Sequence, residues 1–156
     1  MKSQLTDDAI KILKADHKKT SEAFLEYKTL GEDDYSSKLR LVDQICTHLT
    51  IHAIVEEEIF YPAVEESSAK GRELVLQALQ EHASAKALIL ELLELSPRHE
   101  QFNSKVLKLS EYVIDHVEEE NEIFLFAEEM DLDLIALGQN IAERKDELLY
   151  EEVLPT

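Results

Sequence analysis

The chain has 156 residues, of which 44% are hydrophobic, and a formal net charge of −18. Its length and apolar content suit one folded domain with a single core, whereas the charge disfavours nucleic acids and anionic membranes as partners. One cysteine excludes an internal disulfide, and neither a signal peptide nor a membrane span of roughly 20 apolar residues is present, so we expect a cytoplasmic protein.

Five helices are predicted in chain order, because Gly and Pro are rare and apolar residues recur at helical spacing. The first begins at the candidate N-cap Thr6 and ends before Gly31. Pro62 is expected to end or kink the second helix, and residues 63–72 are expected to form a connector. The predicted ranges are about 6–30, 37–61, 72–95, 100–129 and 131–153.

The first four helices are long and have short connections, which predicts an all-α fold, an up-down-up-down four-helix bundle over residues 6–129. Asp131 or Asp133 could cap the additional short C-terminal helix, about 131–153, which we expect to pack against the outside or one end of the bundle. Residues 1–156 are thus expected to form a single domain, with two helical hairpins related by an approximate twofold.

Histidine and glutamate repeat in the same order in the two halves of the chain. In each half a histidine is followed 34 or 35 residues later by a second histidine, and a glutamate comes four residues after that. The chain holds only six histidines, so this register is improbable by chance. The repeated residues are His17, His52 and Glu56 in the first half and His82, His116 and Glu120 in the second.

Each of these histidines lies within the apolar stripe of its predicted helix, so it should point into the bundle. One such histidine is more often a hydrogen-bonded core residue than a metal ligand. Four of them together with two carboxylates would be costly to bury without positive charge between them. We therefore predict a two-metal site, whose ligands suit iron or manganese and do not exclude zinc.

The choice of glutamates needs its own argument, because both candidates lie in acidic runs. In the first half only Glu56 shares the face of its histidine. In the second half both Glu119 and Glu120 could face inward after His116. The position that matches Glu119 in the first half is Val55, so the repeat favours Glu120 as the ligand.

Other polar residues lie near the predicted site. His48 and Tyr112 occupy matching positions, one turn before the second histidine of each half. His48 is either a substitute ligand or, as we prefer, a hydrogen-bonding neighbour of the site, and Tyr112 is expected to be a core tyrosine rather than a redox-active or proton-donating group. Glu57 and Glu58 are predicted to rotate away from the ligand face, and Lys86 to reach the bundle rim.

The motifs around the four histidines resemble the hemerythrin-like, or HHE cation-binding, family of helical bundles. They read ADHKK, IHAIVEEEIFYPAVEE, QEHASAKALI and DHVEEENEIF, and the resemblance covers roughly residues 6–129. The tail LDLIALGQNIAERKDELL is also similar to small bacterial members. The resemblance implies a non-haem di-iron centre, with two iron ions bridged by oxygen and carboxylates. The implied ligands are His17, His52, Glu56, His82, His116 and Glu120.

Two departures from the oxygen-carrying members of that family bear on function. Those members have a further histidine one turn before the one that matches His82, where this chain has Ala78. They also have an aspartate where this chain has Glu120. A third, minor difference is Phe126 in place of a proline. The sequence thus resembles a four-His, two-Glu variant, which implies an iron centre more open to exchange than that of an oxygen carrier.

Three classes of function follow from the sequence. The favoured one is a di-iron protein that binds or handles oxygen, nitric oxide or peroxide as a sensor, store or scavenger. The second is a di-iron enzyme, catalase-like or peroxidase-like, or an iron donor in the repair of nitrosative and oxidative damage. The third is a helical module with a structural metal. Sensing or iron transfer would need a protein partner, and the sequence does not decide between binding and catalysis.

Overall fold

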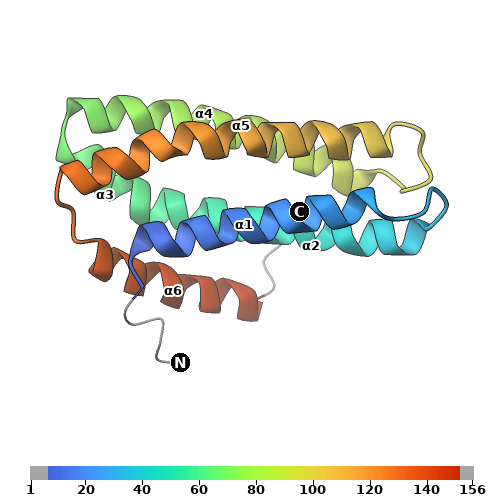
Figure 1. The fold of residues 1–156 in the computed structure, drawn as a ribbon, viewed down its shortest axis with the longest axis horizontal. Coiled ribbons are helices and arrows are strands. Elements are labelled where there is room, and N and C mark those ends of the chain that lie inside the picture. The colour runs from blue at the N-terminus through green and yellow to red at the C-terminus, as the bar shows by residue number, and fades with distance from the viewer. Residues whose placement is uncertain (1–6, 152–156) are drawn as a thin grey trace.

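The computed structural model describes residues 7–151, and over that range the chain is helical, with no strand, as predicted (Figure 1). The second predicted helix is divided into α2, a five-residue π-helix at Glu56–Phe60 and the short α3. The α-helices are α1 (Ala9–Lys28), α2 (Tyr35–Val55), α3 (Tyr61–Ser67), α4 (Ala69–Glu94), α5 (Phe102–Glu129) and α6 (Leu134–Glu151).

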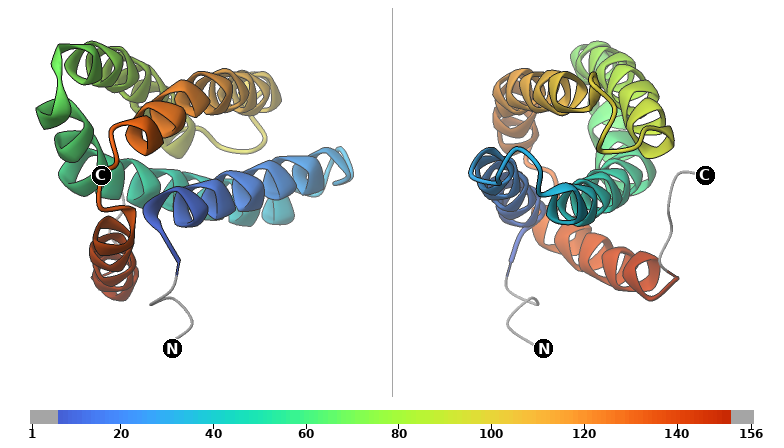
Figure 2. Two further views of the ribbon diagram at one scale, coloured as in Figure 1. Left: turned by 60° about the vertical axis from the view of Figure 1, so that its left-hand side comes forward. Right: turned by 90° about the vertical axis from the view of Figure 1, so that its right-hand side faces the viewer.

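Four long helices form the predicted bundle, and the last helix lies outside it. Viewed end-on, α1, α2, α4 and α5 surround a common axis, while α6 lies against the outer side of α1 and α2 (Figure 2). Its Ile141 and Leu148 are buried in the same core cluster as Leu13 of α1. The predicted position of the C-terminal helix is therefore confirmed. None of the helices described is long and apolar enough to cross a membrane.

Polar caps set the starts of the helices. The carboxylate of Asp8 accepts a hydrogen bond from the backbone N–H of the third residue of α1, Asp34 does the same for α2, and the Ser68 hydroxyl does so for α4. Asp133 accepts from a backbone N–H at the start of α6, so of the two predicted caps it is Asp133 that is used. The candidate cap Thr6 lies outside the described residues.

The prediction for residues 63–72 is wrong, because the chain there is helical on both sides of Ser68. Pro62 does not end the helix, since it occupies the first turn of α3, where the missing N–H of proline costs little. The preceding π-helix widens the backbone, and the N–H of Tyr61 bonds to the carbonyl of Glu56, five residues earlier. The second helix thus continues past the proline with a local bulge.

Two apolar clusters fill the bundle, one on each side of the histidines along its axis. One contains Leu13, Phe60 and residues of α6, and the other contains Phe24, Leu92 and residues of the α1–α2 end. On α1, His17 lies between Leu13 and Phe24, so it marks the boundary between the two clusters. The polar site is therefore enclosed by apolar packing on both sides.

Candidate metal centre

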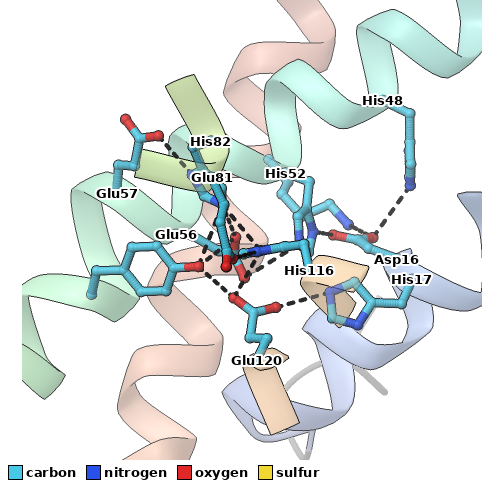
Figure 3. A network of polar contacts seen from close by, with 12 residues as sticks. Asp16, His17, His48, His52, Glu56, Glu57, Glu81, His82, His116 and Glu120 are labelled. Carbon is cyan, nitrogen blue, oxygen red and sulfur yellow. Dashed lines mark hydrogen bonds and ion pairs between the residues drawn. The ribbon is translucent and has the colours of Figure 1, made fainter. Parts of the chain in front are cut away.

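The six predicted site residues converge in the middle of the bundle (Figure 3). Their side chains come from four helices and the π-helix. Within the described residues they form two groups in which one ligand-type atom from each residue lies within 4.8 Å of the others. The groups are His17, His52, Glu56 and Glu120, and Glu56, His82 and His116.

Glu56 belongs to both groups, whereas Glu120 belongs to the first and its other oxygen approaches a histidine of the second. The two oxygens of Glu56 lie 3.3 Å from Nε2 of His52 and 3.1 Å from Nε2 of His82. Those of Glu120 lie 2.9 Å from Nε2 of His17 and 3.6 Å from Nε2 of His116. Two histidines on either side of two shared carboxylates is an arrangement that suits a pair of metal ions.

The structure separates the candidate glutamates in the way that the repeat suggested. Glu120 is 1% exposed and points into the bundle, whereas Glu119 is exposed and its carboxylate accepts from the amide of Gln77. In the first half Glu56 is fully buried. Glu57 lies off the face of His52, but its carboxylate contacts Nδ1 of His82.

Carboxylates hold the outer nitrogens of three histidines. Nδ1 of His52 lies 2.8 Å from Asp16, Nδ1 of His82 lies 2.7 Å from Glu57, and Nδ1 of His116 lies 2.7 Å from Glu81. A carboxylate at one ring nitrogen orients the imidazole and raises the basicity of the other, inward-facing nitrogen. The sequence analysis missed these partners, because each lies on a different helix from the histidine it contacts, with Glu57 in the π-helix itself.

Asp16 connects the site to the helix outside the bundle. Its second oxygen lies 2.5 Å from the ammonium of Lys145 on α6. Burial by itself would raise the pKa of Asp16, but the hydrogen bond from His52 and the charges of His52 and Lys145 outweigh it, so the pKa lies well below its ordinary value. Asp16 is therefore a buried anion with two partners.

Tyr61 is a polar residue of the site that the sequence analysis overlooked. Its hydroxyl lies 3.2 Å from Glu56, 2.5 Å from Glu120 and 3.4 Å from Nε2 of His82. Burial, followed by the charges of the two glutamates, raises the pKa of Tyr61 well above its ordinary value, so the phenol keeps its proton. The i to i+5 spacing of the π-helix brings this hydroxyl to the side of Glu56.

Neighbouring carboxylates favour the protonated form of three of the site imidazoles. Burial would lower the pKa of His82, but hydrogen bonds to Glu56 and Glu57 raise it to about 9. The pKa of His52 and that of His116 are likewise raised, against the effect of burial, by neighbouring carboxylates. The site thus requires cations between its carboxylates, whether protons or metal ions.

Four buried polar atoms of the site make no hydrogen bond of normal geometry, although they approach one another in two pairs, His17 with Glu120 at 2.9 Å and His52 with Glu56 at 3.3 Å. They are Nε2 of His17 and His52 and one oxygen each of Glu56 and Glu120. Such atoms are rare in folded proteins because each carries a desolvation cost. All four atoms come from the residues of the first group, and all four are of types that coordinate divalent metals, so the residues fit a bound metal.

The predictions for the residues around the site have different results. His48 belongs to neither ligand group, and its Nε2 lies 3.8 Å from the carboxylate of Asp16, too far for a hydrogen bond, so its hydrogen-bonding role stays a prediction. The expectation of a core tyrosine at Tyr112 is wrong, because the residue is 39% exposed and lines a cavity. Ala78 is buried in the apolar core, where the corresponding histidine of an oxygen carrier would stand.

A cavity of about 920 Å³ opens onto the site. His17, His52, His82 and His116 line one part of it, and residues of α2, α4 and α5 line the rest. The side chains of His17 and His116 are 12% and 14% exposed, so the site is accessible from this side.

A four-helix bundle with clusters of imidazoles and carboxylates in its core belongs to a class of proteins that hold metal ions between their helices. The chain is a member of the hemerythrin HHE cation-binding family, whose domain model matches residues 8–126. The resemblance of the sequence to that family is therefore confirmed.

Two relatives illustrate the range of the match. A hemerythrin HHE cation-binding domain-containing protein from Mycobacterium kansasii has the same fold, with a TM-score of 0.78 at 20% identity over 94% of this chain and 92% of its own. A protein from Nostoc sp. (strain PCC 7120) named DNA nickase is 32% identical over 116 residues. This match spans 74% of the chain but only 32% of that relative's length.

Proposed function

We propose that the protein is a non-haem di-iron protein that binds or handles small oxidants such as oxygen, nitric oxide or peroxide. The observation that carries the proposal is that Glu56 belongs to two groups of ligand-type atoms. Four buried atoms of one group make no hydrogen bond of normal geometry. The six proposed ligands are His17, His52, Glu56, His82, His116 and Glu120.

The donor set supports iron as the metal. Carboxylate oxygens and imidazole nitrogens together suit iron and manganese, and they would also accept zinc. Two bound iron ions would supply redox-active Lewis acids that a small oxidant can reach from the cavity.

The chain itself would provide orientation and a dry environment. Asp16, Glu57 and Glu81 hold three imidazoles with Nε2 directed inward. Apolar clusters on both sides exclude water along the bundle axis. The Tyr61 hydroxyl holds a proton beside Glu120, where it can donate a hydrogen bond to a ligand that displaces the carboxylate.

We do not extend the name of the Nostoc relative to this chain. The net charge of −18 would repel the phosphates of DNA, and the match spans about a third of that relative's length.

The proposal is tested first by metal content. Protein purified in air should contain about two iron ions per chain and show oxo-bridged charge-transfer bands in the near ultraviolet. His52→Ala and Glu120→Ala should lower the iron content. Glu119→Ala should leave it unchanged, as should His99→Ala, because His99 is exposed in the connection between α4 and α5. Protein of full stability that takes up no iron, or a site emptied by Glu119→Ala alone, would contradict the ligand assignment.

Binding and catalysis are distinguished by mixing the anaerobic ferrous protein with oxygen and then with peroxide in a stopped-flow spectrometer. A persistent change in the spectrum with no turnover supports binding. Continuous oxygen evolution from peroxide instead supports a catalase-like enzyme, the alternative function.

A further inference from the structure

The cavity beside the site is far larger than a small oxidant requires. A water molecule takes up about 30 Å³ of liquid, and oxygen or peroxide has two heavy atoms, whereas the cavity has a volume of about 920 Å³. Cavities of roughly 300–1,000 Å³ are the ones that enclose organic ligands. Two metal ions and a few waters would leave most of this volume free.

The lining of the cavity changes along its length. The imidazoles lie partway along the cavity, because the lining on α4 extends from Gln77 to Leu90, on both sides of His82. Apolar residues line the cavity on one side of the imidazoles, and on α4 this side runs from His82 to Ile89, seven residues, which corresponds to about 10 Å of helix. The apolar lining on this side includes residues that pack in one core cluster, Leu49, Ala85, Ile89 and Val113.

Charged residues around the cavity select against anions. Glu57, Glu81, Asp115 and Glu119 line it, while Lys86 is the single lysine or arginine in the lining. The whole chain also carries a charge of −18, which repels anions at a distance. A metal-loaded site would repel a cationic head group.

We propose that this cavity binds a neutral aliphatic molecule that carries a terminal oxygen function, such as a medium-chain alcohol or alkyl hydroperoxide. The alkyl chain lies along the apolar walls of α2, α4 and α5, and the oxygen function points to the imidazoles. This inference rests on the proposed metal site for the placement of the head group. The apolar part of the cavity belongs to the protein with or without metal.

A homologous series of primary alcohols, from 1-butanol to 1-octanol, tests the inference by isothermal titration calorimetry on the iron-loaded and on the metal-free protein. Burial of each added methylene should tighten binding about three- to fourfold. On the iron-loaded protein, 1-octanol should bind at least about tenfold more tightly than octanoate or octylammonium. An affinity that does not change with chain length, or tighter binding of either charged analogue by the iron-loaded protein, would overturn the inference.

Two alanines on α4 provide a matched pair of variants. Ala85 is half-buried and lines the cavity, whereas Ala87 is exposed and does not. Ala85→Leu should weaken 1-octanol binding about tenfold through lost volume, and Ala87→Leu should leave it unchanged. Val113→Phe, on the opposite wall, should act like Ala85→Leu if the latter does not fold. Equal binding by all folded variants would place the alcohol elsewhere and refute the inference.

The result is separable from that of the proposed function. Protein that contains iron but shows no dependence on alcohol chain length would leave the di-iron proposal standing and remove the cavity ligand. Protein that binds 1-octanol in the cavity but takes up no iron would support the cavity ligand and contradict the di-iron proposal.

Discussion

We predict that α6 stabilises the fold through the ion pair between Lys145 and Asp16, the carboxylate that contacts His52 of the site. Lys145→Met removes the ammonium that lies 2.5 Å from a carboxylate with 5% side-chain exposure. Removing one partner of a fully buried pair costs about 3–5 kcal/mol, whereas an exposed pair contributes about 0–1 kcal/mol. The Lys145 side chain is 21% exposed and Asp16 keeps its contact with His52, so we expect a loss of about 2 kcal/mol.

Urea denaturation of the metal-free protein measures this loss, and a thermal scan should show a midpoint about 4–8 °C lower. The neighbouring Arg144 on the same helix provides the control. Its ion pair with Glu58 is more exposed, at 31% and 49%, so Arg144→Met should cost less than about 1 kcal/mol.

A double-mutant cycle with Asp16→Asn isolates the pairwise contribution. We expect a coupling energy of about 1–2 kcal/mol, because each single variant leaves the other partner without its ion pair. The reasoning is refuted if Lys145→Met costs no more than Arg144→Met, or if the cycle gives a coupling close to zero. Lys145→Arg, which keeps the charge, should restore most of the stability.

Three further predictions concern other parts of the fold. Tyr61→Phe removes the hydroxyl donor from the buried Glu120, which keeps only its contacts with histidines, and should lower the free energy of unfolding of the metal-free protein by about 1–3 kcal/mol, measured in urea. Gly138→Ala would bring a Cβ to 2.5 Å from the carbonyl of Asp7, so we expect a loss of about 1–3 kcal/mol with unchanged iron content; full stability would contradict this packing. Cys46 is buried, and burial followed by a nearby carboxylate raises the pKa of its thiol to about 12, so alkylation at pH 8 should occur only in denaturant and not in the native protein.

The convergence of the six candidate residues was predictable because it depends on spacing within single α-helices. Residues four apart share a face, so His52 with Glu56 and His116 with Glu120 could be paired from the sequence, and the repeat favoured Glu120 over Glu119. Two of these pairs on antiparallel hairpins are enough to place carboxylates opposite each other. The bundle follows from the same periodicity, since the apolar stripes of the helices also carry the histidines.

The carboxylate partners of the histidines could not be predicted from helical periodicity. Asp16 contacts His52 from a different helix, Glu81 contacts His116 across the α4–α5 pair, and Lys145 reaches Asp16 from outside the bundle. Such contacts depend on the rotation and offset of one helix against another, which periodicity along a single helix does not determine. Tyr112 was misplaced for the same reason, because its helical face is open at the cavity.

The π-helix explains why the sequence analysis did not place Tyr61 in the site. In a regular α-helix residues five apart point about 140° away from each other, so Tyr61 would have been placed away from Glu56. The extra residue in the turn moves the Tyr61 hydroxyl to 3.2 Å from the Glu56 carboxylate. π-Bulges cost hydrogen-bond geometry and occur frequently at functional sites. The bulge lies directly after a buried carboxylate and delivers a phenol to it, so we infer that the site, rather than local helix propensity, retains this distortion.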